Sequence, residues 1–410
     1  MKRRDFMKGA LMGAAGAVLP LVGGVAAASK TRSIRVGVLH SLTGTMAISE
    51  IPVKNAELMA IEELNAKGGV LGHHIEPVVV DGESNWPIFA EKARQLIAGD
   101  HVATIFGCWT SASRKAVKPV VEQYDNLLWY PVQYEGNECS KNIIYSGACP
   151  NQQIEPAVTW LLKNKGKRFF LLGSDYVFPR TANAIIKGQL HAEGGTLAGV
   201  EYVPLGHMEF ETVINRMREA RPDVVFSTLN GDSNVAFYKQ FAAAGLTPAK
   251  LPIMAVSIAE VEVQGIGPSY CEGHYAAWNY FETTKGHLNE AFVATYKKRF
   301  GHTQVVDDPI EHGYVNVHLW AKAVERARSF HPMAVRKAAF SIRMDAPQGE
   351  VQISSENQNM SQVARIGEIQ ANGMFKEVWN SGKSLAPKPY SRYISNFVCD
   401  WNKGGLLKRA

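Results

Sequence analysis

The sequence predicts an α/β protein with two doubly wound parallel sheets. The chain has 410 residues, which exceeds the roughly 250 to 300 residues that one hydrophobic core serves, so at least two domains are expected. Short β-branched runs alternate with amphipathic segments about every thirty residues, the spacing of right-handed βαβ units. Hydrophobic residues make up 46% of the chain and charged residues 20%, a balance that excludes wholesale disorder.

Six mostly continuous apolar runs are predicted to be buried parallel strands, because a strand covered on both faces shows little polar alternation. They cover residues 34–39, 75–81, 102–106, 169–173, 224–228 and 253–257. Helices are expected over residues 53–66, 88–98, 112–124, 181–193, 210–220 and 235–244. Two of these helices end at glycine pairs, Gly68-Gly69 and Gly194-Gly195, where glycine adopts a left-handed cap at little cost.

The order of these segments also predicts where the chain changes domain. The alternation breaks over residues 139–156, where turn formers gather, so we expect a first crossing there. The helix-rich stretches 288–300 and 311–327 indicate a return to the first domain before the chain ends in the second. The expected first lobe is therefore residues 33–150 plus about 279–345, and the second is 151–278 plus about 346–401.

Residues 1–28 resemble a twin-arginine signal peptide. A charged start containing Arg3-Arg4 is followed by a Gly/Ala-rich, weakly apolar run that ends in small residues at Ala28. A membrane anchor is the alternative, but five glycines and Pro20 interrupt the run and make it a poor ~20-residue span. We therefore expect cleavage near Ala28 and a periplasmic mature protein that is not embedded in the membrane.

Charge and motifs argue against several functions. The formal net charge is +6, half of it in the signal segment, which leaves no basic footprint for a nucleic acid. The sequence lacks a G-x-S-x-G elbow, an H-E-x-x-H helix and a Walker loop, and Gly265-Ile266-Gly267 runs into Pro268 as a turn. Cys108 has no base visible in sequence and is interpreted as a buried structural cysteine. We expect neither enzyme activity nor a cofactor.

The five cysteines show no C-x-x-C and no Cys/His array, so no metal site is predicted. Cys139 and Cys149 stand ten residues apart. In an oxidising compartment they either form a disulfide or remain free thiols, and the spacing leaves both alternatives open.

Polar and aromatic residues gather where the predicted strands end, which is where open α/β sheets bind ligands. Residues 107–113 and 128–136 follow strands of the first sheet, and residues 173–180 and 228–234 follow strands of the second. Each group has a structural alternative. The helix N-cap position favours the residue types of Ser111, Ser113, Asp232 and Ser233, so these residues could be caps instead of ligand contacts. The aromatic residues of 128–136 could instead form a small hydrophobic cluster beside the main core.

These strand-end motifs resemble the urea-binding proteins of bacterial ABC transporters. The likeness covers almost the whole mature chain, to about Trp379, and is carried by Gly107-Cys108-Trp109-Thr110-Ser111, Tyr130-Pro131-Val132-Gln133-Tyr134-Glu135-Gly136, Pro150-Asn151-Gln152-Gln153, Gly173-Ser174-Asp175-Tyr176-Val177-Phe178-Pro179-Arg180, Asn230-Gly231-Asp232-Ser233-Asn234, Asp308-Pro309-Ile310-Glu311 and Asp345-Ala346-Pro347-Gln348-Gly349. The resemblance implies a type I periplasmic-binding fold, in which two doubly wound parallel-sheet lobes joined by three crossovers enclose a ligand. It further implies delivery of that ligand to ABC transporter permease subunits.

Matched motif by motif, the resemblance implies that eight residues line the ligand site: Trp109, Ser111, Tyr130 and Gln133 in the first lobe, and Tyr176, Asn230, Asp232 and Ser257 in the second. Related amide sensors carry Tyr in place of Trp109 and Thr-Pro in place of Val132-Gln133, which favours a smaller, more hydrogen-bonding pocket and hence urea. Urea offers one acceptor oxygen and four N–H donors, for which Asn230, Asp232 and Gln133 are suitable acceptors.

Three alternatives to urea binding stay open. The same fold binds short-chain aliphatic amides or branched-chain amino acids. A cytoplasmic amide sensor conflicts with the export signal, and an exported hydrolase conflicts with the missing catalytic motifs.

Overall fold

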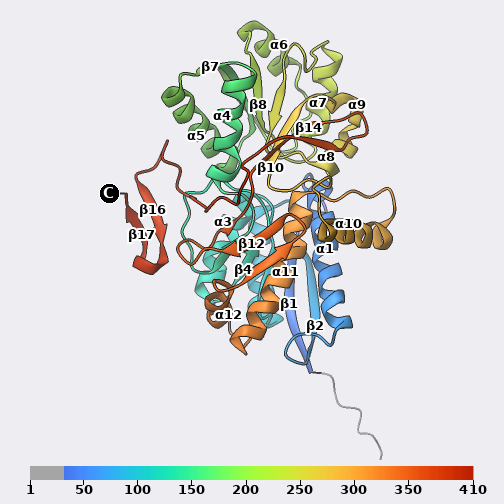
Figure 1. The fold of residues 1–410 in the computed structure, drawn as a ribbon, viewed down its shortest axis with the longest axis vertical. Helices are drawn as coiled ribbons and strands as arrows, with labels where there is room; N and C mark the ends of the chain where they lie inside the picture. Colours follow the sequence, from blue (N-terminus) through green and yellow to red (C-terminus); the bar gives the residue numbers. More distant parts are fainter. Residues whose placement is uncertain (1–31, 410) are drawn as a thin grey trace, which may run out of the picture. The chain divides into compact units, whose positions relative to one another are not determined.

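The computed structural model describes residues 32–409, so the predicted signal peptide lies outside the described residues. We call the five-stranded sheet with its helices the first lobe and the seven-stranded sheet with its helices the second lobe. In Figure 1 the first lobe, which begins with the blue strands, lies in the lower half of the view, and the second lobe, mostly green and yellow, lies in the upper half.

The sheet of the first lobe has the order β2-β1-β3-β4-β5, and all its neighbouring strands are parallel. Helices α1 and α11 cover one face, and α2 and α3 cover the other. Both faces need such a cover because successive strand residues, which are apolar, point their side chains to opposite faces of the sheet. The strands are β1 (Arg32–His40), β2 (His73–Asp81), β3 (Ile105–Gly107), β4 (Leu128–Tyr130) and β5 (Ile143–Tyr145). The helices are α1 (Ala47–Ala66), α2 (Trp86–Arg94), α3 (Ser111–Gln123), α10 (His287–Phe300), α11 (Asp308–Ala327) and α12 (Pro332–Ala339).

The sheet of the second lobe has the order β15-β14-β10-β9-β8-β6-β7, with antiparallel pairing only at the β10-β14-β15 end. Helices α4 and α5 cover one face, and α6, α7 and α8 cover the other. The strands are β6 (Arg168–Ser174), β7 (Thr196–Val203), β8 (Val224–Thr228), β9 (Ile253–Ala255), β10 (Tyr275–Trp278), β14 (Arg365–Ile369) and β15 (Phe375–Asn380). The helices are α4 (Ile154–Asn164), α5 (Val177–Glu193), α6 (Glu211–Ala220), α7 (Ser233–Ala243), α8 (Glu260–Ile266) and α9 (Pro268–Cys271).

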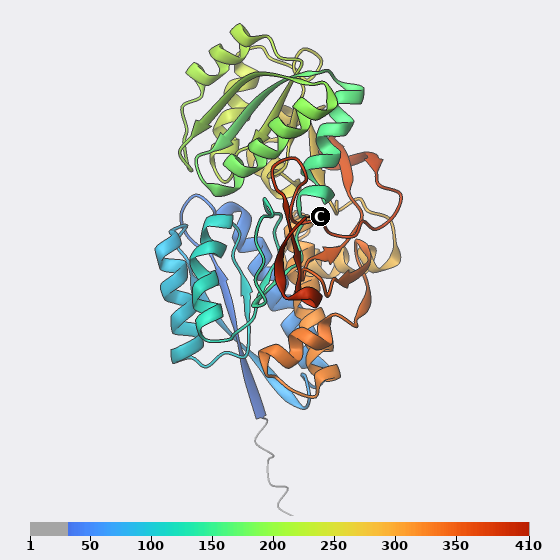
Figure 2. The ribbon, with the colours of Figure 1, turned by 90° about the vertical axis from the view of Figure 1, so that its left-hand side faces the viewer.

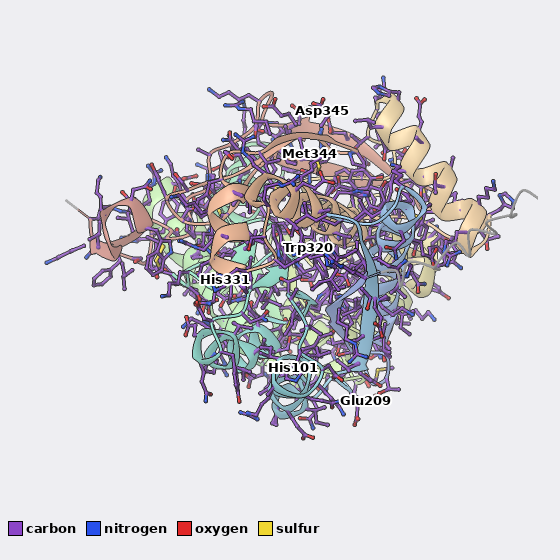
Figure 3. The ribbon with its side chains drawn as sticks, turned by 90° about the horizontal axis from the view of Figure 1, so that it is seen from below. His101, Glu209, Trp320, His331, Met344 and Asp345 are labelled. Atoms are coloured by element: carbon purple, nitrogen blue, oxygen red, sulfur yellow. A yellow bond between two sulfur atoms is a disulfide. The ribbon has the colours of Figure 1, made fainter. Side chains whose placement is uncertain are left out.

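The chain passes between the two lobes after β5, after β10 and before β14. A small antiparallel sheet of β11 (Arg343–Ala346), β12 (Gly349–Ile353) and β13 (Met360–Ser361) packs on the first lobe near α11. Figure 3 shows Trp320 of α11 inside this lobe and Met344 and Asp345 of β11 at its margin. The lobe boundaries predicted from sequence stay a proposal.

The C-terminal segment forms a hairpin of β16 (Phe397–Asp400) and β17 (Gly405–Lys408) outside both sheets. A disulfide joins Cys399 of this hairpin to Cys139, while Cys149 is free and buried. The Cys139–Cys149 bridge considered above is therefore wrong. The true partner lies 260 residues away, a pairing that spacing along the chain does not reveal.

Candidate functional site

Each of the eight expected site residues lies at or just beyond the carboxyl end of a parallel strand. They follow β3, β4, β6, β8 and β9 or, in the case of Tyr130, end the strand. Seven of them are buried, and Asp232 is half-buried. Because the carboxyl edges of the two sheets meet where the lobes touch, the structure gathers residues that are widely separated in sequence.

Gln133 connects the two lobes directly. Its side-chain Nε2 donates to the Val256 carbonyl at 2.8 Å and to the Ser257 hydroxyl at 3.1 Å. The Oε1 atom of the same amide is buried and has no hydrogen-bond partner among residues 32–409. Gln133 therefore bridges from the loop after β4 to the end of β9 and keeps one acceptor unused.

Tyr130 fixes the backbone around Trp109 and Gln133. Its hydroxyl donates to the Trp109 carbonyl and lies 3.4 Å from the Gln133 carbonyl. Burial, more than any neighbouring charge, raises the pKa of Tyr130, so the hydroxyl stays protonated as a donor. The indole Nε1 of Trp109 is buried without a partner in the described part of the chain. Among the eight expected site residues, Trp109 Nε1 is thus an unused donor and Gln133 Oε1 an unused acceptor.

Ser111 is not the N-cap of its helix, and neither is Ser113. The cap of α3 is Thr110, whose side-chain oxygen accepts from the Ser113 backbone N–H at 3.0 Å. The Ser111 hydroxyl instead accepts from Arg114 Nη1 at 3.0 Å and donates to Glu135. Since its only proton is committed to Glu135, Ser111 can offer a ligand a lone pair but no donor.

A buried ionic cluster lies behind Ser111 and was not foreseen from sequence. Arg114 is fully buried and pairs with Glu135 at 3.2 Å and with Glu138 at 2.9 Å, while Lys115 approaches Glu138 at 2.9 Å. Burial favours a neutral Glu138, but Arg114 and Lys115 outweigh it and lower the pKa of Glu138 to about 2. Two cations therefore face two carboxylates. The available signal was the one-turn spacing of Ser111 and Arg114, together with Glu135 in the motif after β4.

In the second lobe, Tyr176 reaches toward the first. Burial, followed by Tyr130 and Glu135 of the first lobe, raises the pKa of Tyr176, so its hydroxyl stays protonated. The ring of Trp86, at the start of α2, lies 6.0 Å from the Tyr176 ring. The two aromatic rings therefore meet across the lobes.

Asn230 and Asp232 follow β8. Asn230 donates its Nδ2 to the Thr228 carbonyl at 3.1 Å, so its side-chain donor group is turned toward its own lobe. Asp232 occupies the N-cap position of α7, but its carboxylate makes no capping hydrogen bond. Ser233 makes none either among the described residues, since its Oγ is buried without a partner. The capping alternative for these two residues is therefore wrong, and burial raises the pKa of the Asp232 carboxyl.

Sequence reasoning missed the loop after β1. The Asp232 backbone N–H donates to the Thr45 carbonyl at 3.3 Å across the lobes. A Cβ on Gly231, which has a φ of +65°, would lie 2.7 Å from that carbonyl. The Ser49 hydroxyl donates to Glu262 Oε1 at 2.6 Å, again across the lobes. The strand-end rule applied to β1 points to this loop, but the partners of Thr45 and Ser49 lie about two hundred residues away.

Three further observations bear on chemistry. Burial raises the pKa of the Cys108 thiol well above its usual value, which makes it an inert structural cysteine as interpreted from sequence. Among residues 32–409 no group of three or more His, Cys, Asp or Glu is arranged to hold a metal ion. None of the helices that the structure describes is long and apolar enough to cross a membrane.

Comparison with known proteins places this geometry in a family context. The family model described as "Periplasmic binding protein domain" matches residues 34–396. The Leu/Ile/Val-binding protein BraC3 of Rhizobium johnstonii is 26% identical over 197 residues, which span 47% of this chain and about half, 53%, of that protein. Leu/Ile/Val-binding protein homolog 7 of Brucella melitensis is 23% identical over 92% of this chain and 96% of its own length.

A solved structure supports the fold. The solute-binding protein of an ABC transporter from R. palustris, in complex with 4-hydroxybenzoate, superposes with a TM-score of 0.76 at 23% identity. The match covers 85% of this chain and 96% of that one. The predicted type I periplasmic-binding fold with two parallel-sheet lobes is thereby confirmed.

Proposed function

The chain belongs to the periplasmic binding protein family, and on this premise we propose that it captures urea between its two lobes and delivers it to the permease of an ABC transporter. The eight strand-end residues form the proposed ligand site. The proposal has three parts, namely the class of ligand, the closing of the lobes and the export of the chain.

The charge balance behind Ser111 is the observation that carries the proposal. Arg114 and Lys115 are matched by Glu135 and Glu138, so no buried cation of this cluster is free for a ligand carboxylate. An amino acid or an aromatic acid buried here needs a counter-charge, since an unpaired buried charge is costly. A neutral ligand needs none. This distinguishes the proposed ligand from those named for the relatives and for the R. palustris protein.

The unused hydrogen-bonding groups also suit urea. Trp109 Nε1 is a donor suited to the urea oxygen, and Gln133 Oε1 is an acceptor suited to a urea amino group. Ser111 offers a further lone pair, because its own proton is given to Glu135. A small neutral amide such as acetamide presents the same oxygen and half the N–H donors, and it is the second candidate because the same groups serve it.

Closing of the lobes follows from the same contacts. A ligand that touches Trp109 in one lobe and Asp232 in the other binds the closed arrangement more tightly than an open one. It therefore shifts the equilibrium toward closure by the difference between the two affinities. Only the closed form would present the surface that the permease recognises.

Export completes the proposal. We keep the cleavage near Ala28 and the periplasmic location as parts of it, together with the lobe boundaries predicted from sequence. The Cys139–Cys399 disulfide supports an oxidising compartment, where such bonds form and persist. Intact mass of the protein recovered from the periplasm tests the cleavage site directly.

The ligand is tested by calorimetric titration of the mature chain from Ser29 with urea, acetamide, leucine and 4-hydroxybenzoate. We expect binding of low-millimolar urea, accompanied by a rise in melting temperature. At a hundredfold excess over the dissociation constant, a ligand stabilises the native state by about 2.7 kcal/mol. Binding of leucine or 4-hydroxybenzoate without urea or acetamide would contradict the charge-balance argument.

Two substitutions test the site itself. Trp109→Phe removes the indole donor and keeps an aromatic ring, and Asp232→Ala removes the proposed acceptor of the second lobe. Each is expected to weaken urea binding by about 1 to 3 kcal/mol, the usual cost of leaving a buried polar group without its partner. Both residues lie in loops, so melting temperatures without ligand should change little. Unchanged affinity in both variants would refute the site assignment.

A further inference from the structure

The loop of residues 133–139, which we call the site loop, contains no helix or strand although most of its residues are buried. It carries Gln133, which reaches the second lobe, and Glu135, which holds the Ser111 hydroxyl. An irregular segment has no hydrogen-bond ladder to define its course. Its position must therefore come from side chains and from neighbouring segments.

The inner side of the site loop is held by the first lobe. Glu135 and Glu138 pair with Arg114 of α3, and the Tyr134 hydroxyl donates to Asn359 Oδ1 at 2.7 Å. These contacts fix side chains. They leave the backbone of residues 136–139 to be held from the other side.

The outer side is held by the C-terminal tail, which we define as residues 381–409. The Asn137 backbone N–H donates to the Pro389 carbonyl at 2.9 Å. Gly136 has a φ of +70°, and a Cβ on it would lie 1.8 Å from the same carbonyl, so the tail packs directly on the loop backbone. Two residues further on, Cys139 is bonded to Cys399 of β16.

The tail is itself anchored along its length. Asn151 donates to the Ala386 carbonyl at 3.0 Å, and Asn357 donates to the Pro387 carbonyl at 3.1 Å. The Tyr393 hydroxyl donates to Glu193 of the second lobe at 2.6 Å. Figure 2 shows the dark-red tail running in front of the junction of the two lobes. The tail therefore touches both lobes as well as the site loop.

We propose that the disulfide-anchored tail positions the site loop, so that ligand affinity depends on the oxidation state of the Cys139–Cys399 pair. This inference rests on the proposed function, because Gln133 and Glu135 act on the ligand only if the site is the one described above. Without the disulfide, the single backbone hydrogen bond from Asn137 and the packing of Gly136 remain between tail and loop. The loop then samples more conformations, and binding must pay the cost of ordering it.

A reductant breaks the Cys139–Cys399 disulfide and no other bond between cysteines. Dithiothreitol supplies two electrons and two protons and becomes its cyclic disulfide, while Cys139 and Cys399 become thiols. The other three cysteines, Cys108, Cys149 and Cys271, are already free and buried. A change on reduction is therefore assigned to the tail.

The test compares oxidised wild type, reduced wild type and Cys399→Ser by calorimetric titration with urea and acetamide, together with hydrogen exchange of residues 133–139. We expect the dissociation constant to rise about tenfold, the effect of leaving one or two side chains to be ordered on binding. Exchange of the Asn137 amide should quicken while the sheets keep their protection. In Cys271→Ser, the matched control, reductant should still weaken binding. In Cys399→Ser it should have no further effect.

A second variant distinguishes the packing of the tail on the loop backbone from the disulfide cross-link. Gly136→Ala keeps both cysteines but forces the Pro389 carbonyl away, so it should weaken binding and loosen the loop with the disulfide intact. Unchanged affinity on reduction, an undisturbed loop, or unfolding of the whole chain on reduction would each overturn the inference. If no ligand binds even the oxidised protein, the proposed function fails, and hydrogen exchange alone still decides whether the tail holds the loop.

Discussion

Removing the Ser49 hydroxyl should weaken ligand binding, although Ser49 is not one of the proposed ligand-binding residues. Ser49 lies in the first turn of α1 and donates to Glu262 Oε1 of α8 across the lobes at 2.6 Å. Both side chains are buried, at 3% and 1% exposure. In Ser49→Ala the carboxyl of Glu262 keeps its bond from the Ala259 backbone at 2.9 Å but loses its second partner.

The loss of this hydrogen bond should destabilise the closed arrangement of the lobes and leave the open arrangement unchanged. An unsatisfied buried acceptor costs about 1 to 3 kcal/mol, whereas in separated lobes water satisfies the same atom. Since closing and binding are coupled, the dissociation constant for urea should rise by about five- to 150-fold. This effect requires that the lobes separate in the absence of ligand.

The loss should also depend on pH. Burial raises the pKa of Glu262, with Asp307, the N-cap of α11, nearby, and the Ser49 bond opposes that shift. Removing the bond raises the pKa of Glu262 in the closed form further. A carboxyl with a raised pKa favours the closed form below that pKa, and this advantage is lost as the pH rises through it. Binding by Ser49→Ala should therefore recover partly as the pH falls.

Calorimetry at several pH values and small-angle scattering measure these effects. Thr104→Val is the matched control, because it removes a buried hydroxyl bond of 2.7 Å to the Leu127 carbonyl inside one lobe. It should lower the melting temperature and leave urea affinity unchanged. The reasoning is refuted if Ser49→Ala binds urea like wild type, or if both variants weaken binding equally.

Two further substitutions give distinct readouts. Burial lowers the pKa of His40, but Glu57 and Glu50 outweigh it and raise the pKa to about 9. Wild type should thus lose about 3 kcal/mol of stability as the pH rises from 6.5 through 9, whereas His40→Gln should not, as guanidinium unfolding would show. Trp86→Ala removes the ring over Tyr176 and should speed ligand release several-fold, since an aromatic pair contributes about 0.5 to 1.5 kcal/mol. Trp160→Ala, which breaks an aromatic pair at 5.1 Å within the second lobe, should leave the release rate unchanged in stopped-flow experiments.

The sequence predicted the longer buried strands because their apolar runs are continuous. β6 and β8 match their predicted runs within one residue. β7 escaped prediction because it is an edge strand whose residues Thr196–Val203 are mostly half-exposed, so no apolar run marks it. β4 and β5 have three residues each, too few for any periodicity. Helix α4 escaped prediction because it begins at Ile154, inside the turn-rich stretch 139–156.

Candidate site residues could be predicted from the sequence only where the strand-end rule was sufficient by itself. The carboxyl ends of parallel strands point to Trp109, Gln133 and Asn230 without knowledge of their partners. Ser49 and the Cys139–Cys399 disulfide depend on pairings across 213 and 260 residues, which a single sequence does not encode locally. The capping alternatives were wrong because caps and ligand groups use the same residue types, and only the observed hydrogen bonds separate them.

Gln133 takes part both in the contact between the lobes and in the proposed contact with the ligand. A variant of Gln133 therefore cannot tell these two contributions to affinity apart. Its Nε2 atom donates across the lobes to Val256 and Ser257, while its Oε1 atom is left for the proposed ligand. Any substitution of Gln133 therefore changes closure and recognition together. Ser49 acts across the lobes without belonging to the proposed ligand site, and Trp109→Phe removes a proposed ligand donor that makes no hydrogen bond within the described residues. Comparing Ser49→Ala, Trp109→Phe and the double variant therefore measures how strongly closure and ligand contact are coupled, which no Gln133 variant can do.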